Sequence, residues 1–353
     1  MRDNEANGLN EPQNKDGQSS LNKLILHPSF LETIENIRKV NIRVTEPPKE
    51  SSFDFSGATF PPNGKLRLVE QLGAYNLSAK KGLEVSKTHY FAGYDESKLK
   101  YVALEGSAFF TSHSLVVATK QEYLPVSYLS FYFYSRSKDI TDISSVFRHS
   151  LDHVADANYD YVKDRSDFLN KWAVENTILF IDGPLIGGNM TQYTLNLVED
   201  LHERNIIPIF FVKNSDSNLV TEAIPELQNR FNSDMHWTYN HLQKGQRTNF
   251  FLYEDEYNFN NAKVFCYLKA FDLSPQRIEF HTKTYLQHQE KIGDLMDLIY
   301  YLLLVHGDKK NPQLRPIAIA EKFAREVLKV SDSFNLIKNS GLMPTMNQER
   351  FGN

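Results

Sequence analysis

Runs of apolar residues separated by short polar connections dominate the middle of the chain. Three such runs between residues 98 and 134 are rich in aromatic and β-branched residues, the composition that strands favour. Because the connections between them are short, consecutive runs are expected to pair in antiparallel fashion. The pattern predicts a meander of three strands over residues 100–107, 109–119 and 125–134.

A different pattern follows, in which two apolar runs flank an amphipathic segment. Residues 177–182 and 206–212 have the composition of strands that are buried on both faces. Residues 190–204 between them repeat Leu and Val at helical spacing. A strand, a helix and a strand in this order form a right-handed crossover, so the two strands are predicted to be parallel.

The rest of the chain is mainly helical in pattern. Residues 139–175 are predicted to form two helices with a break near Ala157-Asn158. After the crossover the pattern predicts a helix, three short strands and three further helices, over residues 217–231, 249–254, 262–270, 277–282, 288–305, 316–330 and 332–339.

These patterns divide the chain into four parts. Residues 1–20 are rich in Asn, Gln, Asp, Gly and Ser and are predicted to be a disordered tail. Residues 21–97 are expected to hold an N-terminal helix and an irregular segment. The main domain is predicted to span residues 98–340, and residues 341–353 form a C-terminal tail.

Composition limits the classes of protein to which the chain can belong. The 353 residues are 41% hydrophobic and 24% charged, which is ordinary for a globular protein with a substantial core. A net charge of -5 gives no overall basic field, so any contact with nucleic acid depends on local Lys and Arg residues. The single Cys266 excludes an internal disulfide and a cysteine-based zinc site, and it fits a reducing compartment. No apolar stretch approaches ~18 residues, so we expect a cytoplasmic protein with no membrane partner.

Two of the predicted strands end in an apolar run, an acidic residue and a glycine. These acids are Glu105, before Gly106, and Asp182, before Gly183. Sites in α/β folds lie at the carboxyl ends of strands, although an acid there can also cap a turn. If the two strands are neighbours, their carboxylates repel each other unless a divalent cation or a shared proton lies between them. Oxygen ligands without cysteine favour Mg²⁺ or Mn²⁺.

Further charged residues are candidates for the same site. Asp160, Asp164 and Asp167 share one face of a predicted helix, where a solvated acidic stripe is the alternative. Lys213 ends the second parallel strand, and its ammonium is either a partner for phosphate or carboxylate or an ordinary surface charge. Glu321 lies near the start of a predicted C-terminal helix, where a carboxylate also stabilises the helix electrostatically. Acids around divalent ions with a lysine nearby suit phosphodiester hydrolysis.

The expected fold is an α/β, ribonuclease H-like mixed sheet, in which an antiparallel meander leads into a parallel strand–helix–strand unit and helices flank the sheet. The chain has no Gly-x-x-x-x-Gly-Lys-Ser/Thr loop, so an NTPase is not expected.

The motifs taken together resemble those of the NurA nuclease family. Val102 to Ser107 resembles the family's Val-Asp-Gly-Ser, with Glu in place of Asp, and Asp182 to Leu185 resembles its Asp-Gly-x-Leu. A strand that ends in Lys213 and the later Arg277-Ile278-Glu279 also follow the family order. The resemblance covers roughly residues 98–330.

The resemblance implies a homodimeric, metal-dependent DNA nuclease that uses Mn²⁺ or Mg²⁺. It also implies docking on a HerA-type hexameric ATPase, a DNA translocase, and a role in DNA end processing or anti-phage defence. Carried over position by position, it assigns the metal to Glu105, Asp182 and Asp164, and it adds Lys213 and Glu321 to the catalytic residues. The family usually presents Ala-His where this chain has Ala320-Glu321. The alternative is therefore a catalytically weakened or inactive NurA-like subunit that docks on the translocase and channels DNA.

Overall fold

The computed structural model describes residues 30–40, 65–118, 122–141, 146–186, 190–213, 216–254, 262–307 and 312–342. The chain divides into two compact units, Met1–Lys49 and Glu50–Asn353. In the first unit the described element is helix α1 (Phe30–Lys39). The tail predicted over residues 1–20 lies outside the described residues, as does most of the tail predicted over 341–353.

The second unit is built on one large mixed sheet. Its described strands follow the order β1-β10-β11-β12-β8-β7-β3-β4-β5-β6, and β2 and β9 pair with each other beside β11. The strands are β1 (Leu66–Leu68), β2 (Ala74–Asn76), β3 (Tyr90–Val102), β4 (Ser107–Ala118), β5 (Tyr123–Ser135), β6 (Phe147–His149), β7 (Thr177–Asp182), β8 (Ile207–Val212), β9 (Gln246–Thr248), β10 (Phe251–Tyr253), β11 (Lys263–Lys269) and β12 (Gln276–His281).

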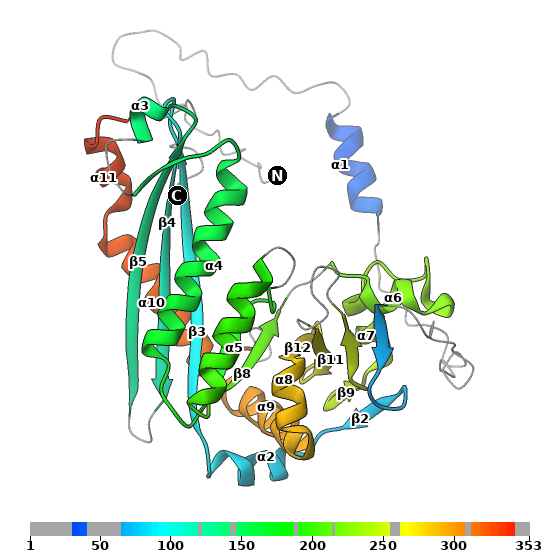
Figure 1. Ribbon diagram of the computed structural model, residues 1–353. Helices are drawn as coiled ribbons and strands as arrows, with labels where there is room; N and C mark the ends of the chain where they lie inside the picture. The colour runs from blue at the N-terminus through cyan, green and yellow to red at the C-terminus, as the bar shows by residue number, and fades with distance from the viewer. Residues whose placement is uncertain are drawn as a thin grey trace, which may run out of the picture. The chain divides into compact units, whose positions relative to one another are not determined.

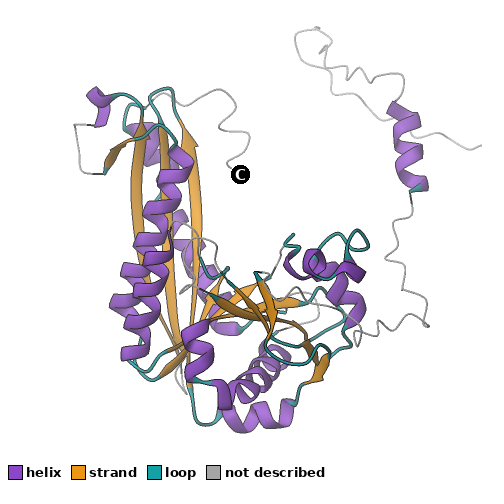
Figure 2. Ribbon diagram, turned by 45° about the vertical axis from the view of Figure 1, so that its right-hand side comes forward, coloured by secondary structure: helices purple, strands orange, loops and turns teal. Residues whose placement is uncertain are grey.

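Helices cover both faces of this sheet (Figures 1 and 2). Long helix α4 lies along β3, β4 and β5, and α10 packs on the same strands from the other side (Figure 1). The helices of this unit are α2 (Ala79–Ser86), α3 (Lys138–Thr141), α4 (His153–Trp172), α5 (Thr191–Glu203), α6 (Leu219–Ala223), η3 (Pro225–Leu227), α7 (Asp234–His241), α8 (Thr282–Gln287), η4 (Gln289–Lys291), α9 (Ile292–His306), α10 (Arg315–Val330) and α11 (Ser333–Asn339). No helix in the described ranges is both long and apolar enough to cross a membrane.

The five central strands confirm the predicted ribonuclease H-like plan. Strands β3, β4 and β5 pair as an antiparallel meander, and β3, β7 and β8 pair in parallel. Helix α5 connects β7 to β8 as the predicted crossover. The order β5-β4-β3-β7-β8 therefore places the first strand of the meander beside the first strand of the crossover unit.

Side chains alternate along each strand, so β7 and β8 contribute to a different core on each face of the sheet. Phe180 and Phe211 lie in the core on one face, together with residues of α9 and with Ile317 of α10. Ile181 and Phe210, each one position away, lie in the core on the other face with residues of α4 and α5. This alternation decides which charged residues can meet at the ends of the strands.

Three predicted elements differ from the structure. Strand β3 begins at Tyr90 and runs through residues 97 and 98, where the main domain was expected to start. Helix α4 is continuous through residues 157 and 158, because buried residues such as Phe168 and Leu169 hold it on the sheet and outweigh the weak helix propensity of Asn. The helix expected over residues 217–231 ends early, since Pro225 cannot donate a helical hydrogen bond.

Candidate active site

Two carboxylates lie side by side where parallel strands β3 and β7 stop pairing. Tyr94 of β3 is the register partner of Ile181 of β7, so the next residues, Asp95 and Asp182, follow on neighbouring strands. Neighbouring strands lie only about 4.8 Å apart. Asp95 is two positions after Gly93, which contacts α10, and Asp182 is two positions after Phe180, so both side chains emerge on the α10 face.

Lys213 and Glu321 extend this pair into a charged cluster. The Lys213 Nζ lies 2.8 Å from Asp182 Oδ2 and 3.9 Å from Glu321 Oε2. Lys213 follows the end of β8, and Glu321 comes from α10. Glu321 also accepts a hydrogen bond from Gln313 Nε2 at 3.2 Å and pairs with Arg325. Strand ends and one helix thus bring together residues that lie up to 226 positions apart in sequence.

The electrostatics of the pair depend on burial. Asp95 is only 6% exposed. Burial, reinforced by the Asp182 carboxylate, raises the pKa of Asp95 to about 8, while Lys213 acts in the opposite direction. Holding both carboxylates ionised therefore costs free energy, and a cation beside them recovers it.

The structure does not bring Glu105 to this site. Glu105 lies in the turn between β3 and β4, and Ala103 and Gly106 close that turn by two backbone hydrogen bonds. Strand β3 continues from Asp95 to Val102, which at about 3.3 Å per residue is a distance of about 23 Å. The Glu-Gly-Ser motif is therefore a hairpin turn, and the carboxylate beside Asp182 comes from Asp95.

Asp164 is also separated from the acid pair. It lies on α4, on the opposite face of the sheet, where its Oδ1 accepts a hydrogen bond from Tyr132 of β5 at 3.0 Å. Asp160 similarly accepts a hydrogen bond from Tyr134 at 2.7 Å, and Asp167 is exposed. Of the predicted site residues, the structure brings together Asp182, Lys213 and Glu321 and leaves Glu105 and Asp164 elsewhere.

Asp95 is the residue that sequence reasoning missed, although a signal for it exists. The segment from Tyr90 to Tyr94 is an apolar and aromatic run followed by Asp95, the same order of residue types that precedes Asp182. The signal was hidden because this segment was assigned to the irregular N-terminal part. It was also hidden because β3 continues past Asp95 instead of ending there.

The loop that follows Asp182 is fixed by two hydrogen bonds, of which the second is buried. Gly183, with φ +93°, donates its N–H to Phe211 O at 2.7 Å. Leu185 donates its N–H to Glu279 Oε2 at 2.7 Å. Burial acts to raise the pKa of Glu279, but the charges of Lys263 and Arg277, whose nitrogens each lie 2.8 Å from Oε1, lower it below its usual value. The ionised carboxylate of Glu279 on β12 therefore holds in place the segment that follows Asp182.

The donor set fits one hard divalent cation. Within the described ranges, no group of three or more His, Cys, Asp or Glu side chains is close enough to hold a metal. Mg²⁺ nevertheless binds commonly through one or two carboxylates, and waters and substrate phosphates supply its other ligands. The adjacent Asp95 and Asp182 carboxylates, with the raised pKa of Asp95, meet that requirement.

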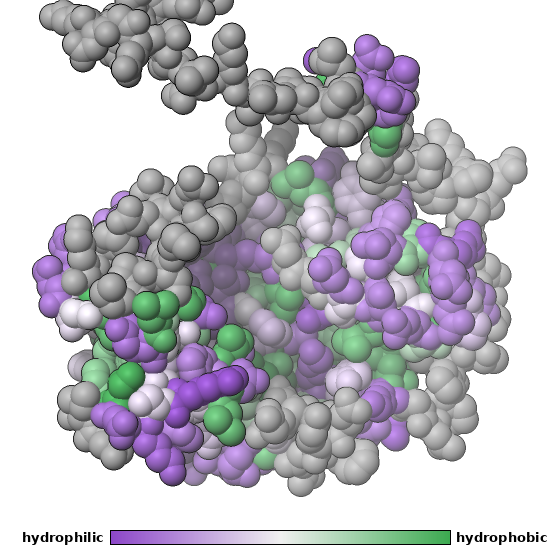
Figure 3. Space-filling model, turned by 90° about the horizontal axis from the view of Figure 1, so that it is seen from above, coloured by the Kyte–Doolittle hydropathy of each residue, from purple (hydrophilic) through white to green (hydrophobic). Residues whose placement is uncertain are grey.

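The surface above this part of the molecule is hollowed. Viewed from above, the surface is hollowed in the middle, and both hydrophilic and hydrophobic residues line the hollow (Figure 3). Strand β8 points upward in Figure 1, toward the side of the molecule that Figure 3 shows.

Comparison with known proteins identifies the family. The family model described as the NurA domain matches residues 72–326, more than two thirds of the chain. A search of curated proteins finds no match.

Solved structures give weaker likenesses. The NurA nuclease from Sulfolobus solfataricus is 10% identical, with 76% of this chain and 88% of that chain covered and a TM-score of 0.49. A NurA structure bound to dAMP and manganese is 7% identical, with coverage of 66% and 84% and a TM-score of 0.36. Endonuclease V from Bacillus subtilis is 11% identical, with coverage of 77% and 89% and a TM-score of 0.36. The domain match over residues 72–326 confirms the resemblance noted in the sequence, and the chain belongs to the NurA family.

Proposed function

We propose that this protein is a metal-dependent deoxyribonuclease that hydrolyses phosphodiester bonds at the Asp95–Asp182 pair. Membership of the NurA family supports a nuclease function. The observation that carries the proposal is the placement of two carboxylates, one of them buried, on neighbouring parallel strands. An arrangement that is unfavourable without a cation is typical of a metal-binding catalytic site.

The residues of the cluster have distinct roles in this proposal. Asp95 and Asp182 would hold Mn²⁺ or Mg²⁺, which would supply positive charge to the phosphate and activate water. Lys213, whose Nζ contacts Asp182, binds a phosphate oxygen through its ammonium group. The Glu321 Oε2, 3.9 Å from that ammonium, accepts a proton from the attacking water. The Glu279 anchor keeps the segment after Asp182 in place.

The family membership extends the proposal to biological context. We propose that the substrate is DNA, at ends or in single strands, and that the protein works as a homodimer with a HerA-type hexameric translocase. The corresponding roles are DNA end processing or anti-phage defence in the cytoplasm. Co-purification with such a translocase, and stimulation of cleavage by it, tests this part separately from catalysis.

The catalytic proposal is tested by cleavage of linear DNA with Mn²⁺. We expect Asp95→Asn and Asp182→Asn each to lower the cleavage rate at least about 100-fold, because each removes a metal ligand while keeping side-chain volume. The matched control is Glu105→Gln, an acid in the hairpin turn, which is expected to cleave like the wild type. Equal loss in all three variants, or loss in Glu105→Gln alone, contradicts the proposed site. Circular dichroism verifies that each variant is folded.

A second candidate function follows from the contacts of Glu321. Gln313, Arg325 and Lys213 all approach its carboxylate, at the position where the family usually has histidine. This arrangement favours a structural subunit that channels DNA without cutting it. Absence of cleavage by the wild type, even with the translocase present, supports this second function and rejects the first.

A further inference from the structure

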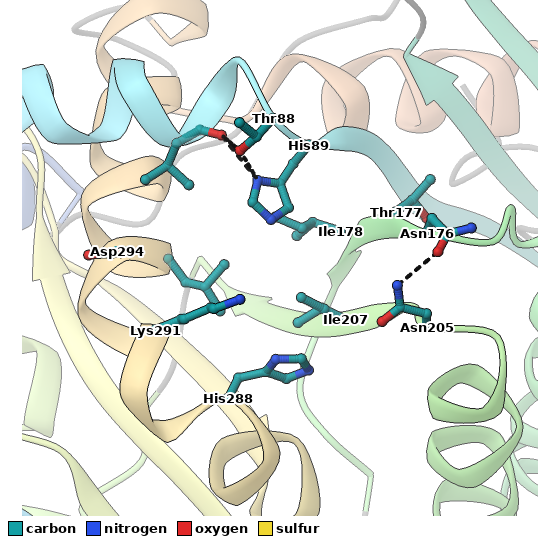
Figure 4. Close-up of a pocket in the computed structure, with 12 residues that line it drawn as sticks. Thr88, His89, Asn176, Thr177, Ile178, Asn205, Ile207, His288, Lys291 and Asp294 are labelled. Atoms are coloured by element: carbon teal, nitrogen blue, oxygen red, sulfur yellow. Dashed lines mark hydrogen bonds between the residues drawn. The ribbon is translucent and has the colours of Figure 1, made fainter.

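A cavity lies at the opposite end of the central strands from the acid pair. Its volume is ≈ 350 Å³, within the range of small-molecule sites. The first residues of β7 and β8 line it, whereas Asp182 is the last residue of β7. Its floor is apolar and is formed in part by Ile178 and Ile207 (Figure 4).

One side of this cavity carries nitrogen-bearing side chains. His89 precedes β3, His288 precedes η4, and Lys291 ends η4. Figure 4 shows Lys291 directed into the cavity, between His89 and His288. The lining carboxylate, Asp294, forms an ion pair with Lys81 at 2.5 Å. This side of the cavity is therefore suited to an anion.

The other side carries a pair of amides. Asn205 donates its Nδ2 to Asn176 Oδ1 at 2.8 Å (Figure 4). Both residues have left-handed backbone conformations, with φ of 59° for Asn176 and 55° for Asn205, which Asn tolerates better than most residues. The bond fixes the two amides and leaves the Asn205 Oδ1 oxygen and the Asn176 Nδ2 hydrogens for a ligand. Side-chain amides are well matched to the edges of nucleobases.

These three features together describe a ligand with an anionic end and a flat ring, whose faces suit the apolar floor and whose edge forms hydrogen bonds. We propose that the cavity binds a nucleoside monophosphate, with the phosphate against Lys291 and His288 and the base toward the Asn176–Asn205 pair. The choice of a nucleotide among small organic phosphates rests on the proposed function, because a deoxyribonuclease releases products of this class.

The test is calorimetric titration of the full chain with dAMP in buffer that contains EDTA, so that no divalent ion is available to the acid pair. We expect saturable binding with one site, and at least about tenfold weaker binding by Lys291→Ala, since this variant loses a charge-assisted contact with phosphate. The matched control is Lys163→Ala, an exposed lysine on α4, which is expected to bind like the wild type. Inorganic phosphate and deoxyadenosine are each expected to bind more weakly than dAMP.

The absence of saturable dAMP binding at millimolar concentration overturns the proposal, and so does equal affinity for dAMP and inorganic phosphate. The proposal is also overturned if Lys291→Ala still binds dAMP while Asp182→Asn does not. The last result places dAMP at the acid pair instead. Cleavage of linear DNA is measured in parallel without added nucleotide, and Lys291→Ala is expected to match the wild type. Lysine-dependent binding by a protein that does not cut DNA rejects the proposed function while it supports this site.

Discussion

At the scale of single residues, Asp95 determines how the acid pair responds to pH. Its folded-state pKa of about 8 lies above the value of about 3.9 expected in the unfolded chain. The folded protein therefore binds more protons than the unfolded chain between these values. The contribution of Asp95 to the free energy of unfolding is therefore largest below about pH 4, and it falls as the pH rises toward 8.

The substitution Asp95→Asn removes this penalty. In metal-free buffer at pH 8.5 we expect the free energy of unfolding of the variant to be about 2 kcal/mol higher than that of the wild type. At pH 4.5 we expect the two free energies of unfolding to be nearly equal. Urea denaturation at the two pH values measures the effect. The exposed Asp167→Asn on α4 is the control, with an expected change below about 0.5 kcal/mol at both pH values. A variant that is less stable than the wild type at pH 8.5 contradicts this account.

At the scale of elements, the close approach of α10 to β3 sets the position of Glu321 relative to Asp95. A Cβ added at Gly93 would lie 2.3 Å from Pro316 C and 2.5 Å from Ile317 N. These atoms belong to the backbone of the first turn of α10, so the helix would have to move. Glycine at position 93 therefore allows the helix to carry its carboxylate to the acid pair.

We expect Gly93→Ala to lower the free energy of unfolding by about 1–3 kcal/mol, because overpacking forces a backbone shift. The variant is also expected to cleave DNA more slowly. Thermal unfolding and the cleavage rate check both effects. Gly293→Ala in α9 is the control, since a Cβ there meets nothing within 4 Å and alanine favours a helix. Wild-type stability of Gly93→Ala would show that α10 is not held in this way.

The elements also show how far the sequence alone determines the fold and the site. Uninterrupted apolar runs such as residues 177–182 correctly predicted β7 and its crossover, because burial on both faces leaves a strong local pattern. The position of Asp95 in the site depends instead on which strand β7 pairs with and on where that pairing stops. Register partners in β3 and β7, such as Tyr94 and Ile181, lie 87 residues apart, and pairing over that separation has no local signature. The turn acid Glu105 was therefore predicted in place of Asp95.

At the scale of the whole molecule, the chain separates into the units Met1–Lys49 and Glu50–Asn353. Both the large sheet and the family match, residues 72–326, fall in the second unit. We expect deletion of residues 1–49 to change the free energy of unfolding of the sheet unit by less than about 0.5 kcal/mol. The cleavage rate is expected to stay the same. Loss of folding on truncation, measured by urea denaturation, would show that the first unit stabilises the second.

The location of bound Mn²⁺ in crystals of the full chain tests the central claim most directly. Anomalous diffraction is expected to show a manganese ion between the carboxylates of Asp95 and Asp182, and Asp95→Asn is expected to abolish it. A manganese ion bound at Glu105 or Asp164 would contradict this account, as would an acid pair that remains empty at saturating Mn²⁺.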